Sequence, residues 1–207
     1  MTNVRVFYTK TGRMRFISHL DTTRFFTRML RKSEIPVYYT EGFNKHPYLN
    51  FILPLPLGFE STWEIVDFKV TEEISFDEIF ARLNAVMPDG IKILKVTSPV
   101  FAAKDCRFAE YFIDFNKDVS KDLLVFLNGP SIVVEKKGKK GKISTIDILP
   151  LIKKYEIMGT GLDIILPAGN EININPTLFC VAFLGDKNLN YSILRKAILT
   201  EDLKIFE

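Results

Sequence analysis

The chain has 207 residues and a formal net charge of +3; 47% of its residues are apolar and 26% are charged. This composition is typical of a soluble globular protein with one large core or two small ones. No run of about eighteen apolar residues could cross a membrane, and the first residues enter a strand pattern without the apolar region of a signal peptide, so we expect a cytoplasmic protein.

The first hundred residues follow one recognisable order of elements. Apolar and polar side chains alternate over residues 4–9, which predicts a strand with one face in the core. Ser18 and Asp21 form a capping box at the start of a predicted helix, and a second capping box begins at Ser75. The expected elements are strand 4–9, helix 19–32, strands 35–40, 49–57 and 63–70, helix 76–87 and strand 91–96. This is the ferredoxin-like βαββαβ order with an elaborated hairpin, in a domain of residues 1–98.

The second half follows a predicted linker at residues 97–106. Asn175 and Pro176 predict the start of a helix, whereas residues 191–199 fit either a strand or a helix. The other expected elements are strand 111–115, helix 120–128, a hairpin of 132–135 with 143–148, a hairpin of 162–166 with 171–174, and helix 176–184. The sequence therefore predicts an α+β fold of two tandem ferredoxin-like units, with a second domain of residues 107–207.

The charges are unevenly distributed. Basic side chains predominate in residues 1–50 and 131–154, whereas acidic ones predominate in 51–130 and 155–207. A solvated face accounts for many such clusters, but two basic clusters with aromatic neighbours favour a polyanionic partner, here RNA. Three arginines at helical spacing fall on one stripe of the first helix, and three more basic residues precede it. These candidates for nucleic-acid contact are Arg24, Arg28 and Arg31, with Lys10, Arg13 and Arg15.

The second basic cluster is the tip of the predicted hairpin 132–148. Its five lysines and two glycines suit sequence-independent contact with phosphate, because lysine is a flexible point charge. A soluble tip that limits edge-to-edge aggregation is the alternative. The lysines are Lys136, Lys137, Lys139, Lys140 and Lys142.

Residues 41–60 are rich in glycine, proline and polar side chains, so fixed and permissive φ angles shape their backbone. We expect a displayed loop that leads into a buried strand; a simple connection between two strands is the alternative. Asn44, Lys45 and His46 can contact phosphate or a base edge. Four aromatic side chains are candidates for stacking on bases: Tyr38, Tyr39, Phe43 and Tyr48.

Both histidines of the chain, His19 and His46, lie in these segments. If the loop folds over the first helix, they form a polar cluster with nearby carboxylates. An acid–base pair could then cleave RNA without a metal. Alternatively the two histidines and a carboxylate could hold a divalent metal ion, or both histidines could be structural. No catalytic residue is assigned, and His19 and His46 are the candidates.

The two cysteines, Cys106 and Cys180, are far apart in the sequence. They cannot supply the ligands of an iron–sulfur cluster or of a four-cysteine zinc site. We therefore expect no cofactor bound by this chain alone, and we expect both cysteines to be buried free thiols.

Residues 10–21, which follow Thr9, match the pattern K-x-G-x-[LM]-R-[FY]-[IL]-S-H-L-D, and residues 41–47 match E-G-F-N-x-H-P. Residues 53–58 extend the match, and residues 134–148 and 175–195 agree more loosely. On these segments the chain resembles the radical-SAM-linked protein family, a domain of unknown function. In that family the domain is appended to a cobalamin-type radical SAM enzyme or occurs as a separate chain. The resemblance implies the separate kind, in an accessory role with a radical SAM enzyme in trans.

We therefore expect an accessory protein that binds structured RNA for a radical SAM enzyme, in RNA modification or processing. A tandem ferredoxin-like chain with a basic N-terminal helix is also similar to CRISPR repeat-processing endoribonucleases. One alternative is thus a metal-independent endoribonuclease that uses His19 and His46. Another is a protein-interaction module that docks on the radical SAM subunit through residues 51–59. No complete catalytic set is present, so the sequence favours a protein that is not itself an enzyme.

Overall fold

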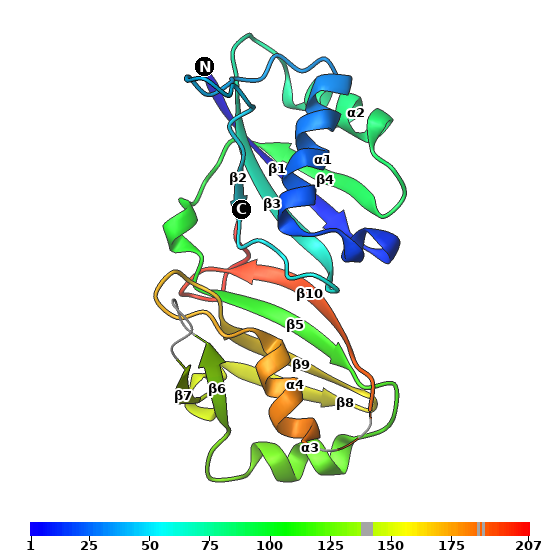
Figure 1. Cartoon of the computed structure of the whole chain (residues 1–207), viewed down its shortest axis with the longest axis vertical. Helices are drawn as coiled ribbons and strands as arrows, with labels where there is room; N and C mark the ends of the chain where they lie inside the picture. The colour runs from blue at the N-terminus through cyan, green and yellow to red at the C-terminus, as the bar shows by residue number, and fades with distance from the viewer. Residues whose placement is uncertain (138–142, 186, 188) are drawn as a thin grey trace. The chain divides into compact units, whose positions relative to one another are not determined.

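The computed structural model describes residues 1–137, 143–185, 187 and 189–207. The chain forms two compact units (Figure 1). Unit 1 comprises Met1–Asp105 together with Phe206–Glu207, and unit 2 comprises Cys106–Ile205. Each unit packs helices against an antiparallel sheet, so the predicted α+β class is confirmed.

Unit 1 contains a four-stranded antiparallel sheet in the order β4-β1-β3-β2. The chain passes in order through β1 (Thr2–Lys10), the 3-10 helix η1 (Gly12–Phe16), α1 (His19–Lys32), β2 (Asn50–Ile52), β3 (Glu60–Val70), α2 (Phe76–Val86), β4 (Ile91–Thr97) and η2 (Ala103–Asp105). This strand order and connectivity are consistent with a ferredoxin-like unit.

The two helices of unit 1 lie on the same face of its sheet (Figure 1). Phe26 and Leu30 of α1 and Ile79 of α2 share one core with Val6 and Val66 of the sheet. Both helices begin at the predicted capping boxes, where a serine hydroxyl accepts from the backbone N–H three residues on. The capping residues therefore fix where each helix begins.

The predicted strands 35–40 and 49–57 are mostly wrong. The first forms only isolated bridges, one of them between Val37 and Val70, and the second shortens to β2. Pro54 and Pro56 have no backbone N–H to donate, and Leu53 adopts a positive φ of 52°. These residues end the strand and turn the chain away from the sheet edge.

Both faces of β1 are buried, although the alternation predicted only one buried face. Val4 faces the helices, while Arg5 and Phe7, on the other face, are also almost completely buried. Phe7 packs against Trp63 with ring centroids 4.9 Å apart. Arg5 is held there by partners within unit 1.

Those partners include the last two residues, Phe206 and Glu207, which we call the C-terminal clasp. Arg5 donates two hydrogen bonds of 2.7 Å to the carboxylate of Asp67 and one of 2.9 Å to the main-chain oxygen of Glu207. Its guanidinium lies 5.0 Å from the ring centroid of Phe206, and the Trp63 indole donates to the Phe206 carbonyl at 3.3 Å. These two residues thus belong to unit 1, whereas the predicted second domain extended to residue 207.

Unit 2 has the same strand order, β10-β5-β9-β8, with an extra hairpin. Its elements are β5 (Phe108–Asp114), α3 (Ser120–Leu127), β6 (Val133–Lys137), β7 (Ile143–Asp147), η4 (Leu149–Leu151), β8 (Lys154–Met158), β9 (Gly161–Pro167), α4 (Pro176–Leu184) and β10 (Ser192–Leu199). The β6–β7 hairpin forms a separate two-stranded sheet. Phe126 of α3 packs against Phe179 and Phe183 of α4.

One predicted pairing in unit 2 is wrong. The hairpin partner of β9 is β8, which precedes it, and residues 171–174 contribute only a bridge from Asn173 to Ala168. β8 was missed because it is a mostly exposed edge strand without alternation of apolar side chains. Gly159, with a φ of +58°, provides the turn between β8 and β9. Residues 191–199, which the sequence left undecided, form β10.

Both cysteines lie in unit 2 as buried free thiols, as expected. Burial raises the pKa of Cys106 to about 11 and that of Cys180 to about 12. Both side chains are therefore protonated and unreactive near neutral pH.

Candidate functional site

The arginine stripe of α1 faces away from the core. Arg24, Arg28 and Arg31 are exposed, because the buried positions Phe26 and Leu30 direct the opposite face of α1 to the sheet. The Arg24 guanidinium lies 3.4 Å from a carboxylate oxygen of Asp21. This ion pair is exposed and contributes little to stability. The stripe therefore presents guanidinium groups to solvent.

Arg31 joins the stripe to the loop that precedes β2. Its Nε–H donates to the Tyr39 hydroxyl at 3.2 Å, and the guanidinium lies 5.7 Å from the centroid of the Tyr39 ring. Tyr39 in turn bridges to Pro47, which closes the base of the loop. The stripe and residues 39–48 are thus directly connected, and we call the two together the helix–loop surface.

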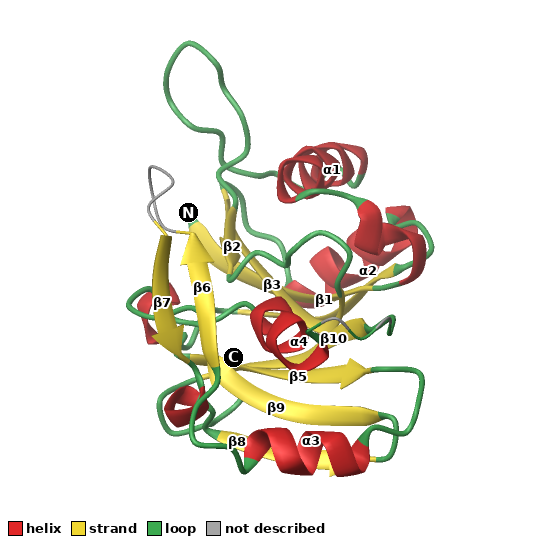
Figure 2. Ribbon diagram, turned by 60° about the horizontal axis from the view of Figure 1, so that its bottom comes forward, coloured by secondary structure: helices red, strands yellow, loops and turns green. Residues whose placement is uncertain are grey.

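The tip of that loop is exposed and extends away from the body of unit 1 (Figure 2). Thr40 N–H donates to the His46 carbonyl at 2.8 Å, and His46 N–H donates to the Thr40 hydroxyl at 3.3 Å. The Phe43 ring is fully exposed, and Asn44 and Lys45 are also exposed. The loop therefore displays an aromatic ring, an amide and a cation on a base closed by hydrogen bonds.

The His46 imidazole is held by its own loop. Its Nδ1 lies 3.0 Å from the Asn44 carbonyl oxygen and 3.2 Å from the Thr40 hydroxyl. With the proton on Nδ1, the ring donates to Asn44, and Nε2 is then an acceptor. This arrangement suits recognition of a donor on a ligand.

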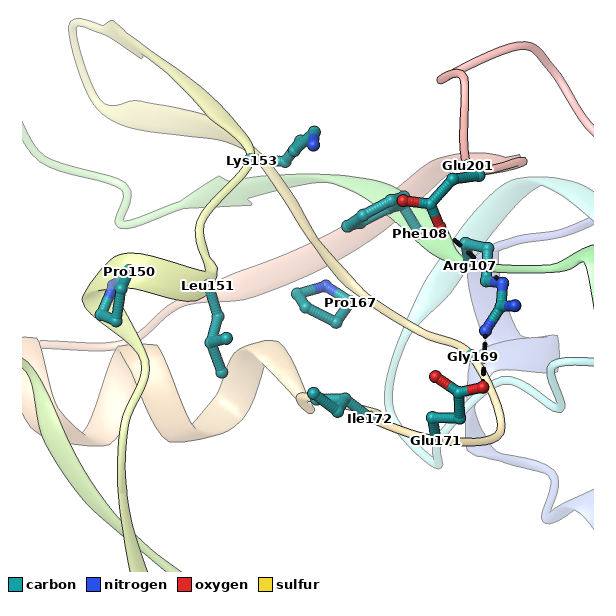
Figure 3. A pocket seen from close by; sticks show the side chains of 10 residues that line it. All are labelled: Arg107, Phe108, Pro150, Leu151, Lys153, Pro167, Gly169, Glu171, Ile172 and Glu201. Atoms are coloured by element: carbon teal, nitrogen blue, oxygen red, sulfur yellow. Dashed lines mark ion pairs between the residues drawn. The ribbon is translucent and has the colours of Figure 1, made fainter.

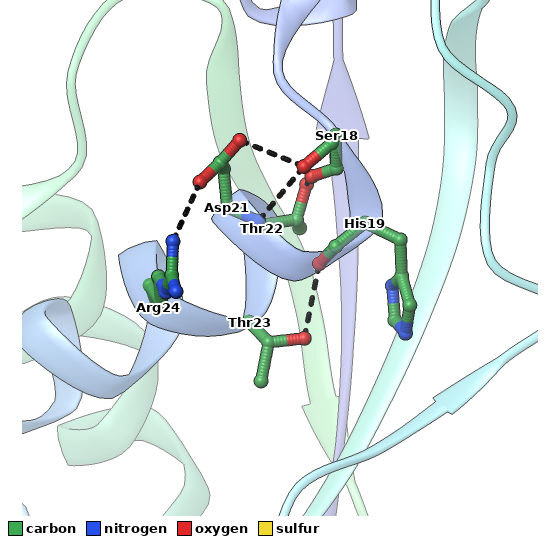
Figure 4. A network of polar contacts seen from close by, with 6 residues as sticks. All are labelled: Ser18, His19, Asp21, Thr22, Thr23 and Arg24. Atoms are coloured by element: carbon green, nitrogen blue, oxygen red, sulfur yellow. Dashed lines mark hydrogen bonds and ion pairs between the residues drawn. The ribbon is translucent and has the colours of Figure 1, made fainter.

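His19 opens α1, and its ring points away from the polar network at the helix start (Figure 4). In that network Ser18 donates to Asp21 at 2.7 Å and accepts from the Asp21 N–H at 3.1 Å. The His19 ring instead makes an edge contact with Phe51, with centroids 5.2 Å apart. Partial burial and, to a smaller extent, the charge of Lys10 lower the pKa of His19, so the ring favours its neutral form.

Behind His19 lies a small polar cavity. Its volume is about 10 Å³, enough for the centre of one water molecule and too small for a substrate. Two charged side chains line it, Lys10 with 1% and Glu64 with 2% exposure. The remaining lining residues are Tyr8, His19, Thr22, Phe51, Pro54 and Leu55.

The burial of Lys10 contradicts its predicted contact with nucleic acid. Its ammonium donates to the Ile17 carbonyl at 2.9 Å, inside unit 1. Alternate residues of a strand lie on the same face. Lys10 is two residues after Tyr8, whose side chain faces the core, so Lys10 lies on that face as well. Lys10 thus supports the segment before α1 and is not exposed to a phosphate.

Sequence reasoning missed Glu64 altogether. Glu64 shares a face of β3 with Val66 and Phe68, both buried, and it pairs with Tyr8 across the sheet. A carboxylate at an apolar position of a strand is the signal that could have found it. Lys10 is likewise a charged residue at a core-facing position, on β1.

The structure gives the two histidines separate neighbours. The loop of His46 contacts α1 through Tyr39 and Arg31, and twelve residues of helix, about 18 Å, separate Arg31 from His19. His19 instead contacts Phe51. Within residues 1–137 and the other described ranges, no contact joins the histidines and no three His, Cys, Asp or Glu side chains form a metal-binding group. The sequence-based acid–base pair and metal site are therefore not assembled.

The remaining predicted contacts differ in their availability. Arg13 is exposed, whereas Arg15 lies over Phe16 at 4.8 Å and 3.6 Å from a Glu60 carboxylate oxygen. Lys136 donates to the Asn173 carbonyl at 2.9 Å. Lys137 is the last residue of β6. The other predicted tip residues, Lys139, Lys140 and Lys142, lie outside the described residues.

No helix in the described parts of the chain is long and apolar enough to cross a membrane.

Comparisons with known proteins place the chain in a family. A search of curated proteins found no match. The model of one family, described as an uncharacterized protein conserved in bacteria (DUF2344), matches residues 3–176, which include all of unit 1 up to Asp105 except its first two residues. The chain belongs to this DUF2344 family.

Proposed function

We propose that this protein binds structured RNA through the helix–loop surface and acts as an accessory to a radical SAM enzyme in trans. The contact between Arg31 and Tyr39 carries the proposal, because it joins the arginine stripe to the loop that displays Phe43. Guanidinium groups pair with phosphates, and an exposed aromatic ring stacks on an unpaired base. Cationic and stacking groups on one surface are the combination that single-stranded parts of RNA require.

The loop supplies the groups for sequence preference. Asn44 offers both donors and an acceptor, and His46 offers an acceptor in the tautomer that its loop favours. Arginine contacts to phosphate give affinity without sequence preference. The proposed division of labour is therefore affinity from α1 and selectivity from residues 43–46.

The surroundings of His19 support the accessory role. The polar cavity behind it holds no more than a water, and His46 belongs to a separate set of contacts. The endoribonuclease alternative thus gains no support from the geometry. The radical SAM partner is proposed from the sequence motifs in residues 9–21 and 41–58 alone.

A docking module is the second candidate, favoured by an exposed apolar patch. Phe16, Leu20 and Leu57 are each more than half exposed. The Gly58 N–H donates to the Arg15 carbonyl at 2.9 Å, which holds the segment containing Leu57 against η1. Co-purification of a radical SAM subunit that is lost in Leu57→Asp and retained without RNA would favour this candidate.

The RNA proposal predicts binding that weakens steeply with salt. Full-length protein is titrated with total cellular RNA at several salt concentrations, beside a variant with Arg24, Arg28 and Arg31 changed to Ala. Losing three phosphate contacts makes the negative slope of log affinity against log salt shallower by about 2, at about 0.7 per contact with single-stranded RNA. Affinity falls at least tenfold at low salt.

A matched control removes the same charge elsewhere. Lys92, Lys104 and Lys121 are exposed, and changing all three to Ala lowers the net charge equally. This control retains most of the affinity and slope of the wild type. Equal losses in both variants would show that net charge alone drives binding, and binding that ignores salt would reject the proposal.

A further inference from the structure

Unit 2 contains a cavity of about 260 Å³ that no sequence motif indicated (Figure 3). It lies between η4, which contributes Leu151, and the turn after β9, which contributes Ile172. Phe108 and Pro167, paired across β5 and β9, line it between these two segments. Four elements therefore enclose one recess.

Backbone contacts hold one side of the recess together. Ala168 N–H donates to the Arg107 carbonyl at 2.8 Å, which ties the turn after β9 to the start of β5. A Cβ added at Gly169 would lie 2.9 Å from the Cys106 carbonyl oxygen, so the two backbones approach closely there. Tight backbone packing on that side keeps the opening in place.

Its walls are apolar and its rim is charged. Leu151, Pro167 and Ile172 offer apolar surface in the recess, and Figure 3 shows Arg107 between two carboxylates at one side. The Arg107 guanidinium lies 3.3 Å from a Glu171 oxygen and 3.8 Å from a Glu201 oxygen. That side of the rim therefore presents donors and acceptors, and its two carboxylates outnumber the one guanidinium.

A second cation stands apart from these carboxylates. The Lys153 ammonium lies 5.5 Å from the centroid of the Phe108 ring, at the mouth of the recess. Lys153 is exposed, so its ammonium can also meet an anion outside the recess. Lys153 thus supplies a positive charge that is separate from the Arg107–carboxylate group.

We propose that this recess binds a single unpaired nucleobase, with the attached phosphate near Lys153. A base has apolar faces for Pro167 and Ile172 and a neutral edge of donors and acceptors for the Arg107–Glu171 rim. The volume is below the range of about 300–1,000 Å³ typical of drug-sized ligands, so it suits one small ring system. The two carboxylates repel a phosphate near Arg107, which orients the base inward. The choice of ligand depends on the proposed RNA-binding function.

The test uses single nucleotides and the full-length protein. AMP, GMP, CMP and UMP are titrated separately while the methyl resonances of Leu151 and Ile172 are followed by NMR. At least one nucleotide shifts both resonances in a saturable way. Ile172→Glu, which places a carboxylate at a half-exposed wall position, weakens that binding at least tenfold, as followed at Leu151.

Val125→Glu is the matched control, because Val125 is exposed on α3 of the same unit and is no part of the recess. It binds the nucleotide as the wild type does. Absence of shifts with all four nucleotides, or equal binding by Ile172→Glu, would overturn the assignment. Tighter binding of N-acetyl-tryptophanamide than of any nucleotide would also overturn it, in favour of a peptide side chain.

The failure of this inference can be distinguished from failure of the proposed function. The triple Arg24, Arg28, Arg31→Ala variant loses RNA but still binds the mononucleotide, because its changes lie in unit 1. RNA binding without mononucleotide binding rejects the recess alone. Mononucleotide binding without RNA binding rejects the helix–loop surface and retains the recess.

Discussion

At the scale of single residues, the most informative positions are the charged ones on buried strand faces. Lys10 and Glu64 share a cavity of unit 1 and face away from solvent. Buried charges are costly unless they are paired or hydrogen-bonded, so they restrict the conformations open to their surroundings. His19 lies at this cavity, and its protonation reports on the polar interior.

His19 is expected to titrate below its ordinary pKa of 6.5, because burial and the Lys10 charge disfavour the imidazolium. The unfolded chain then binds this proton more readily, so folding stability decreases as the pH falls through 6.5 towards the folded pKa. NMR titration of the imidazole resonances, assigned with His46→Gln, measures the midpoint. Lys10→Met moves it upward only in part, since burial is the larger cause. A midpoint at or above 6.5 in the wild type would contradict the prediction.

At the scale of elements, α1 combines a capped start with an exposed basic stripe. The Ser18 cap fixes where α1 begins. Within the helix, the i, i+4, i+7 spacing places Arg24, Arg28 and Arg31 on one face. Ser18→Ala is expected to cost about 1 kcal/mol of stability, because one N–H of the first turn loses its acceptor.

Urea unfolding measures this loss. Thr23→Ala on the same helix is the control, since the Thr23 hydroxyl only bonds back to the His19 carbonyl and Ala has a higher helix propensity. It is expected to be neutral or slightly stabilising. Equal losses in both variants would mean that the cap has no special role.

The sequence predicted elements where local chemistry decides them. Capping residues located α1 and α2 because a cap acts within four residues of the helix start. β8 escaped prediction because an exposed edge strand needs no apolar alternation. Lys10 was misassigned because its charge was considered without the face of the strand on which it lies. The recess of unit 2 was not predicted because its walls come from segments about sixty residues apart in the chain.

At the scale of the whole molecule, the chain order and the two units do not coincide. Unit 2 occupies the sequence between Asp105 and Phe206, both of which belong to unit 1. No local pattern could reveal this, since the contact of Arg5 with Glu207 spans almost the whole chain. The repeated strand order, in contrast, follows from the repeated succession of strands and helices.

Phe206→Ala is expected to destabilise unit 1 by about 3–5 kcal/mol, because it empties a fully buried aromatic site beside Arg5. Hydrogen exchange at the amides of β1 accelerates, whereas exchange in the core of unit 2 changes less. Ile205→Ala, at an exposed neighbouring position, changes either rate little. Uniform acceleration across both units would show that the clasp does not act on unit 1 in particular.

The clasp also determines which unit can complete its contacts last during synthesis. Arg5 leaves the ribosome 202 residues before Glu207, which supplies one of its hydrogen-bond acceptors. Until Glu207 emerges, the Arg5 guanidinium on β1 lacks this acceptor. Unit 1 is therefore started first and finished last, while the residues of unit 2 are all translated before that closure.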